Sequence, residues 1–215
     1  KPVTNNTGNE SKVVIWSNDF SVGADWAMTN TSSPAQDWTI ETDPNLVPAW
    51  GPANMTTVAN GDGLIDSDGA GQSANQNADL TYTGTIDLSL YPNVVIEFEQ
   101  HYRTYLDTRS VMISTDGGTN WDVVVVTDGT EANTNVDAPF SANISAIAGG
   151  QANVMLKFNY VGSWGWHWAV DDVTIIEQPV DDVQLLSAWV VGENNEGIEY
   201  GRYPNDQMDA NWIVG

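Results

Sequence analysis

Short apolar runs alternate with polar turns along most of this chain. Residues 94–102 (VVIEFEQHY) begin as a continuous apolar run and then alternate, as a sandwich strand with one solvated face does. No segment keeps the period of a long amphipathic helix, and 140–147 is expected to form one short helical turn. Further strands, rich in Val, Ile, Tyr and Trp, are predicted at 13–16, 38–41, 78–82, 110–114, 121–127, 153–160, 166–170 and 173–176. The pattern predicts an all-β chain folded as an antiparallel two-sheet jelly-roll sandwich.

Two changes in composition divide the chain. Residues 1–12 are rich in Asn, Thr and Gly and are interpreted as a lead-in to the predicted jelly roll, which extends over 13–178. Pro179 follows the last predicted strand, so 179–183 is expected to be a linker. Residues 184–215 restart a strand pattern but are too few for a sandwich of their own. We expect them to be the opening strands of a truncated second module.

The chain carries a strong negative charge. It has 6 lysines and arginines against 29 acids, and a formal net charge of −23. Such a surface repels nucleic acids and anionic membranes and attracts divalent cations, so we expect no nucleic-acid partner and no membrane insertion. No apolar run approaches the ~20 residues that span a bilayer. The chain has no cysteine, but its length and its 41% of hydrophobic residues suffice for a core without disulfides.

Two adjacent carboxylates, Asp171 and Asp172, lie between an aromatic run and the apolar segment 173–176. Burying such a pair is costly unless positive charge compensates it, and no basic residue is near in the sequence. A hard cation with oxygen ligands is the natural solution, so the pair is predicted to bind calcium. The alternative is that one carboxylate caps a turn and the other is solvated.

A second acidic group surrounds the segment 62–69 (DGLIDSDG). Asp66 and Asp68 share the D-x-D-G spacing of a tight loop, and Asp79 follows downstream. Such a loop can present carboxylates to calcium, although no EF-hand is present, because no bidentate Glu follows and no helices flank it. The alternative is a surface turn rich in Asp and Gly.

Aromatic residues provide the candidate ligand-binding positions. Trp164 and Trp166 alternate with other residues as on one face of a strand, and Tyr102 belongs to a second possible patch. Exposed rings in a row can stack on sugars, whereas in the alternative they belong to the core. The long segments 49–78 and 128–141 are read as loops that could carry specificity.

Enzymatic chemistry has little support in this sequence. Two histidines, no cysteine, no Gly-x-Ser-x-Gly elbow and no phosphate loop leave no recognisable catalytic frame. The hairpin 114–121 (STDGGTNW) is similar to the Asp-box of propellers, but it occurs once, so it is interpreted as a structural turn. We therefore expect no active site.

The order of several short motifs resembles that of the MAM-like jelly rolls, and most closely the cleaved-adhesin modules of secreted Bacteroidetes surface proteins. The motifs extend from residue 13 to 176 and are Asn18-Asp19-Phe20, Trp26, Trp38, 64–69 (LIDSDG), Leu80, Ile86-Asp87-Leu88, 94–99 (VVIEFE), 111–121 (VMISTDGGTNW) and 169–173 (AVDDV). The resemblance implies a calcium-containing, non-catalytic module in which Asp19, near the first strand, meets Asp171 and Asp172. It also implies that the C-terminal segment leads to an Ig-like module. Ser21 stands where the family usually has Glu, and the disulfides of animal MAM domains are absent.

The sequence thus predicts a calcium-stabilised binding or adhesion module of a larger secreted or cell-surface bacterial protein. Its expected partners are an extracellular protein or glycan and the neighbouring domains of the same polypeptide. Two alternatives are open. One is a carbohydrate-binding module attached to an exported hydrolase, which an exposed aromatic strip would distinguish. The other is a structural spacer or assembly unit.

Overall fold

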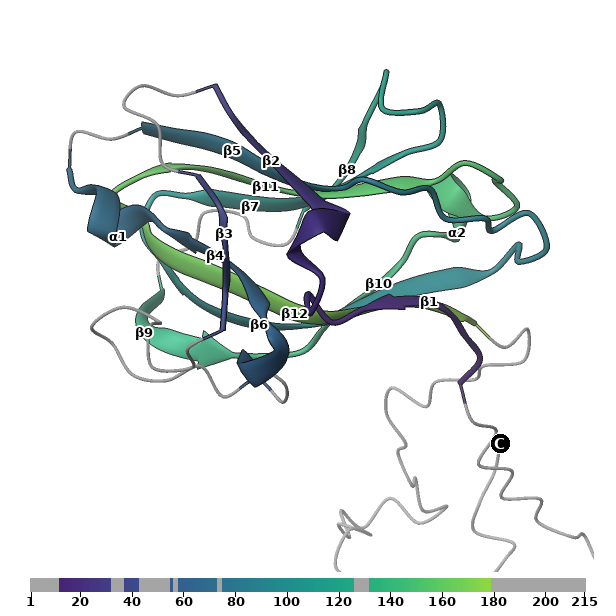
Figure 1. Cartoon of the computed structure of the whole chain (residues 1–215), viewed down its shortest axis with the longest axis horizontal. Coiled ribbons are helices and arrows are strands. Elements are labelled where there is room, and N and C mark those ends of the chain that lie inside the picture. Colours follow the sequence, from purple (N-terminus) through teal and green to yellow (C-terminus); the bar gives the residue numbers. More distant parts are fainter. Residues whose placement is uncertain are drawn as a thin grey trace, which may run out of the picture. The chain divides into compact units, whose positions relative to one another are not determined.

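The computed structural model describes residues 12–31, 37–42, 55, 58–72, 75–125 and 132–178. Two antiparallel sheets face each other across one hydrophobic core (Figure 1), which confirms the predicted jelly-roll β-sandwich. The chain divides into two units between Val180 and Asp181, and every described element lies in the first. The predicted linker at 179–183 and the predicted strands within 184–215 lie outside the described residues. No helix of the described part has the length and hydropathy needed to cross a membrane.

Sheet A is the larger sheet, with seven strands. Its strands are β1 (Val14–Asn18), β3 (Thr39–Glu41), β4 (Asp62–Asp66), β6 (Val94–Thr104), β9 (Ala132–Asp137), β10 (Phe140–Asn143) and β12 (Trp166–Glu177). The order is β10-β6-β12-β4-β3, with β1 paired to β12 and β9 paired to β6.

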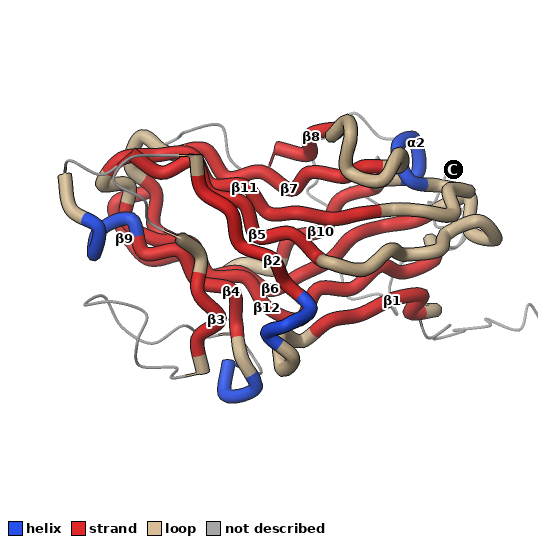
Figure 2. Tube along the Cα trace, turned by 45° about the horizontal axis from the view of Figure 1, so that its top comes forward, coloured by secondary structure: helices blue, strands red, loops and turns tan. Residues whose placement is uncertain are grey.

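Sheet B has five strands, in the order β2-β5-β11-β7-β8. They are β2 (Trp26–Asn30), β5 (Asn75–Tyr82), β7 (Thr108–Ser114), β8 (Asp122–Val125) and β11 (Met155–Ser163), and they form the second layer in Figure 2. Short helical turns connect the strands at η1 (Gly23–Asp25), η2 (Val58–Asn60), α1 (Ser67–Ala70) and α2 (Ser145–Ala148).

Aromatic side chains fill the space between the sheets. Trp38, Phe158 and Trp168 are buried, and their rings meet edge to face or tilted, with centroids 5.4–6.5 Å apart. Phe158 is in β11, where buried and partly buried residues alternate, as in a strand with one face on a core. The indole N–H of Trp168 donates to Gln100 Oε1 at 3.0 Å, so this large ring is buried without leaving its polar atom unpaired.

The central strand β12 changes partner halfway along one edge. Residues 167–170 pair with β4, whereas 173–176 pair with β1, and β12 pairs with β6 along its other edge. The register shifts between Asp171 and Thr174, and Asp172 has a positive φ of 49°. This bulge places Asp171 and Asp172 where the end of β1 meets the start of β4.

Several predicted elements differ from those in the structure. The two strands predicted at 166–170 and 173–176 are one strand, because the bulge bends β12 without ending it. The helical turn expected at 140–147 is a strand followed by a single turn, β10 and α2. The expected loops 49–78 and 128–141 contain β4 and β9, and β2 was not predicted. β4 was not predicted because Gly63 and two aspartates, which are uncommon in strands, make up three of its five residues.

We expect Trp168→Ala to lower the free energy of unfolding by about 3–5 kcal/mol, because it leaves a cavity in the aromatic core. Trp164→Ala serves as the matched control. That side chain is 44% exposed, and its removal should change the free energy by less than about 0.5 kcal/mol. Urea unfolding followed by tryptophan fluorescence measures both changes. Equal losses in the two variants would contradict this assignment of the core.

Candidate functional site

A buried acidic pair lies at the junction of β1, β4 and β12. Asp171 is fully buried, and Asp62, the first residue of β4, is 1% exposed. Glu41 in β3 is the register partner of Asp62. Among the described residues, neither carboxylate oxygen of Asp62 has a hydrogen-bond partner. The sequence motif 62–69 contained Asp62, but its side chain was not among the predicted ligands.

Burial, as the largest cause, and the nearby charges of Asp171 and Glu41 together raise the pKa of Asp62 to about 7. A buried carboxylate without a donor is costly, so a proton or a cation must compensate it. Asp171 is itself partly satisfied, because its Oδ1 accepts the backbone N–H of Asp172 at 2.7 Å. The orphaned oxygens of Asp62 therefore fit a hard cation such as calcium.

A surface pocket of about 360 Å³ lies beside this pair and is lined by Asn18, Asp19, Asp25 and Asp172, among others. The structure thus brings two of the three residues predicted at the main metal site, Asp19 and Asp172, to one pocket. Asn18 organises the pocket wall, since its Oδ1 accepts from Phe20 N and Trp26 Nε1, both at 2.9 Å. Hydrogen bonds from Ser21 hold the pKa of Asp19 below its usual value.

The other predicted metal ligands lie elsewhere. Asp66 accepts the N–H of Gly69 at 2.8 Å and so caps the turn of α1, which also contains Asp68. Asp79 lies in sheet B and forms an ion pair with Lys157 at 2.8 Å. In the described ranges, no three His, Cys, Asp or Glu side chains gather closely enough to hold a metal ion by themselves.

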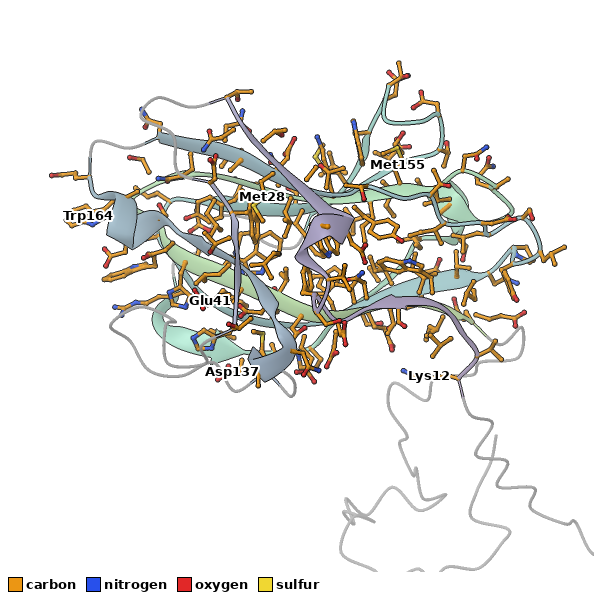
Figure 3. All side chains as sticks on the ribbon, in the orientation of Figure 1. Lys12, Met28, Glu41, Asp137, Met155 and Trp164 are labelled. Carbon is orange, nitrogen blue, oxygen red and sulfur yellow. The ribbon has the colours of Figure 1, made fainter. Side chains whose placement is uncertain are left out.

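Exposed apolar side chains gather at one end of the sandwich. Tyr105 and Leu106 lie in the turn between β6 and β7 and are 41% and 68% exposed, while Trp164 lies in the turn between β11 and β12. Figure 3 shows Trp164 at the end of the sandwich that carries α1. We call Tyr105, Leu106 and Trp164 the aromatic tip. The two turns touch directly, because a Cβ on Gly165 would lie 3.1 Å from the carbonyl oxygen of Tyr105.

A buried polar framework holds the tip in place. Gly165 N donates to Ser67 Oγ at 2.9 Å, and Tyr105 N donates to Asp107 Oδ1 at 2.7 Å. Asp107 forms an ion pair with Arg109 at 3.5 Å, and both side chains are buried. Desolvation raises the pKa of Asp107 to about 6, although the Arg109 charge opposes the shift. Such a framework fixes the turns above it, and sequence reasoning had missed it.

Of the three predicted ligand-binding residues, only Trp164 is exposed. The Arg103 guanidinium carbon lies 3.7 Å from the ring centroid of Trp166, and that of Arg109 lies 3.5 Å from the ring centroid of Tyr102. Both rings are partly buried. Trp164 and Trp166 have left-handed backbones, so the expected strand alternation does not hold before Trp168. Trp166 and Tyr102 are therefore each covered on one ring face by an arginine.

Two buried histidines stack on each other near this end. His101 in β6 and His167 in β12 have ring centroids 5.0 Å apart and nearly parallel planes. His101 Nδ1 contacts Asp137 Oδ1 at 2.5 Å, whereas neither ring nitrogen of His167 has a hydrogen-bond partner among the described residues. Burial, as the largest cause, and the neighbouring His101 together lower the pKa of His167 to about 3. Stacked rings do not aim their in-plane lone pairs at one point, so the pair is a poor chelator.

Comparison with known proteins identifies the fold. No family model and no curated protein matches the sequence. The K1 cleaved adhesin domain of Lys-gingipain from Porphyromonas gingivalis W83 is 15% identical, with a TM-score of 0.52 over 76% of this chain and 98% of that domain. The K3 cleaved adhesin domain of the same protein is 14% identical, with a TM-score of 0.50 over 77% of this chain and 100% of that domain.

A third solved structure is the CBM22-2 xylan-binding domain of Paenibacillus barcinonensis Xyn10C. It is 14% identical, with a TM-score of 0.42 over 76% of this chain and 99% of that domain. At such identities the adhesin similarities establish the fold alone. The function has to be inferred from the residues of this chain.

Opposite pH dependences are expected from Asp62 and His167 in metal-free protein. The unfolded chain releases the Asp62 proton near pH 4, whereas the folded chain keeps it up to about pH 7, so stability is lost as the pH rises from about 4 to 7. His167 stays neutral in the fold while the unfolded chain takes up a proton below about pH 6.5, so stability is lost as the pH falls towards 3.

Single substitutions separate the two effects. Relative to wild type, Asp62→Asn should gain stability as the pH rises from 4 to 7, and His167→Gln should gain stability as it falls from 6.5. Each slope should reach at most about 1.4 kcal/mol per pH unit. Urea unfolding with EDTA at pH 4 to 8 tests both, and stability curves parallel to that of wild type would contradict the assigned pKa shifts.

Proposed function

We propose that this chain is a non-catalytic binding or adhesion module of a secreted or cell-surface protein, stabilised by calcium. It engages an extracellular partner through the aromatic tip. The observation that carries this proposal is the location of backbone strain. Among the described residues, the non-glycine positions with positive φ are Phe20 and Asp172 at the acidic junction, Leu106 and Trp164 in the aromatic tip, and Trp166 at the start of β12.

Left-handed backbone costs energy for residues other than glycine and is typical of functional positions. At the tip, residues with this costly backbone conformation also expose large apolar side chains to solvent. Leu106, for example, is 68% exposed, so burial of its side chain does not offset the cost of its backbone conformation. A role in the fold gives no reason for that arrangement, whereas a binding surface does.

The composition of the tip indicates the class of partner. Trp164 and Tyr105 would suit either a sugar ring or a protein, since aromatic side chains are common in both kinds of site. The aliphatic side chain of Leu106 adds apolar surface without a hydrogen-bonding group, which favours an extracellular protein. A glycan at the tip is the second candidate, supported by the exposed ring of Trp164.

Calcium would be held at the junction of β1, β4 and β12. Asp62 and Asp171 would supply buried carboxylates. Asp19 and Asp172 line the neighbouring pocket and would have to move closer to the ion to join them, because no three acids of the described residues gather closely enough by themselves. When bound, the ion would neutralise the charges that raise the pKa of Asp62 and so tie three strands together. This differs from the predicted set, because Asp62 joins it while Asp66, Asp68 and Asp79 lie elsewhere.

Calcium should raise the melting temperature at pH 8, and EDTA should lower it. A free calcium concentration of about a hundred times the dissociation constant should raise the free energy of unfolding by about 2.7 kcal/mol. Asp62→Asn should remove most of this increment and make the calcium-free protein more stable, because it removes a buried charge. Asp122→Asn, an exposed residue of β8, is the control and should keep the wild-type response. An equal calcium shift in Asp62→Asn and wild type would refute the site.

Binding through the tip should depend on its side chains. On an array of extracellular proteins and glycans, Leu106→Ala and Trp164→Ala should each weaken retained protein signals at least tenfold. Leu90→Ala is the matched control, because Leu90 is an exposed leucine (82%) in another turn. Protein signals that survive both tip substitutions, or that fall equally with Leu90→Ala, would place the protein binding elsewhere. Loss of glycan signals alone would favour the second candidate.

A further inference from the structure

The outer face of sheet B carries little charge, although the chain as a whole has a net charge of −23. Its five strands contain few charged residues. Arg109 is buried, Asp79 and Lys157 pair with each other, and Asp122 lies in the edge strand β8. The strands of sheet A hold many more acids, namely Glu41, Asp62, Asp66, Glu97, Glu99, Asp137, Asp171, Asp172 and Glu177. The negative charge of the described strands is therefore concentrated in sheet A.

Amide and carboxylate groups form a connected row on this face of sheet B. Asn159 in β11 lies opposite Asp79 in β5, and its side-chain amide donates to Asp79 Oδ1 at 2.6 Å and to Asn77 Oδ1 at 3.2 Å. Lys157 Nζ donates to the other oxygen of Asp79 at 2.8 Å. We call Asn77, Asp79, Lys157 and Asn159 the amide row. Its hydrogen bonds fix the side chains, so a ligand would meet groups that are already oriented.

An aromatic ring continues the row. Lys157 Nζ lies 4.5 Å from the ring centroid of Trp121, just before β8. The turn that carries Trp121 is well ordered by its own bonds. Asp116 Oδ1 accepts from Thr119 N at 3.0 Å and Asn120 N at 2.9 Å, and Trp121 Nε1 donates to the carbonyl of Gly118 at 3.0 Å. Hydrogen bonds from Asn120, Ser114 and Thr119 together lower the pKa of Asp116 to about 2, so the turn keeps its charge above acidic pH.

We infer that the amide row and Trp121 form a binding site for an uncharged oligosaccharide, separate from the aromatic tip. Amide and carboxylate groups supply both donors and acceptors, as the hydroxyls of a sugar require, and Trp121 adds an apolar edge. Asp79 cancels the charge of Lys157, so the site has no net attraction for an anionic glycan. The acidic chain as a whole repels one.

The uncharged character of the face matters as much as its hydrogen bonds. A protein partner of ordinary composition would remove water from the Asp79–Lys157 pair at a cost in desolvation free energy. The hydroxyls of a sugar can take the place of that water as hydrogen-bond partners, which offsets the cost. The exposed side chains of Asn77 and Val161 lie on the same outer face of the sheet. A face that combines oriented polar groups with exposed apolar side chains is suited to an extended chain of neutral sugar units that lies along the strands.

The inference is tested by screening the 215-residue chain on an array of neutral and acidic oligosaccharides. The strongest signal is then measured by isothermal titration calorimetry. We expect binding confined to neutral glycans, weakened at least tenfold by Asn159→Ala and by Trp121→Ala. Asn153→Ala, an exposed amide in the turn before β11, should bind as wild type does. Melting temperatures establish that each variant is folded, and Asn159→Ala keeps the test decisive if Trp121→Ala disturbs the hairpin.

The tip and the amide row are distinguishable in the same experiment. Leu106→Ala and Trp164→Ala should leave neutral-glycan binding unchanged if the amide row is the site. The inference is overturned if no neutral glycan binds, if only acidic glycans bind, or if binding survives Asn159→Ala. It is equally overturned if the glycan signal falls with Trp164→Ala and not with Asn159→Ala, which would locate the glycan at the tip.

Discussion

The pairing of β12 is the constraint on which the rest of the structure depends. This strand pairs with β6 along one edge, and with β4 and then β1 along the other. The change of partner requires a bulge, and the bulge falls at Asp171-Asp172. The end of β1 and the start of β4 therefore both lie against Asp171-Asp172. Negative charge is concentrated at this junction, where it is buried from water.

The junction explains why this sandwich needs a counter-charge. A Cβ on Gly61 would lie 2.9 Å from the carbonyl of Phe20, so the end of β1 and the start of β4 are in close contact there. Asp62 is buried at this contact, and no described residue donates to either of its oxygens. Metal-free protein can relieve the charge by holding a proton on Asp62, whereas the cation that we propose would relieve it at any pH above the acidic range. Binding of that cation would link the stability of the sheet to its ionic environment.

The two ends and faces of the molecule differ in chemistry. Acids are concentrated in sheet A, the outer face of sheet B carries the amide row beside exposed apolar side chains such as Val161, and exposed apolar residues also gather at the turn between β6 and β7 and at Trp164. A rigid sandwich allows this separation because successive side chains of a strand point to opposite faces. The fold thus supplies independent surfaces, and our two proposals assign different partners to two of them. A calcium ion at the junction would support both surfaces without touching either.

The sequence by itself determined the all-β class and the sandwich, because the period of two in segments such as 94–102 follows directly from strand geometry. It also indicated the importance of Asp171-Asp172, since a carboxylate pair beside apolar residues is costly in any fold. The tertiary structure decided which acids meet them. Asp62 is more than a hundred residues away in the chain and reaches Asp171 only because β4 pairs with β12, whereas Asp66 is used to cap a turn. Likewise, strand alternation predicted that Trp164 and Trp166 share a face, but the turn before β12 takes a left-handed backbone there, and only Trp164 is left in solvent. Local periodicity carries no information on strand pairing or on strained turns, because both are set by contacts between distant segments.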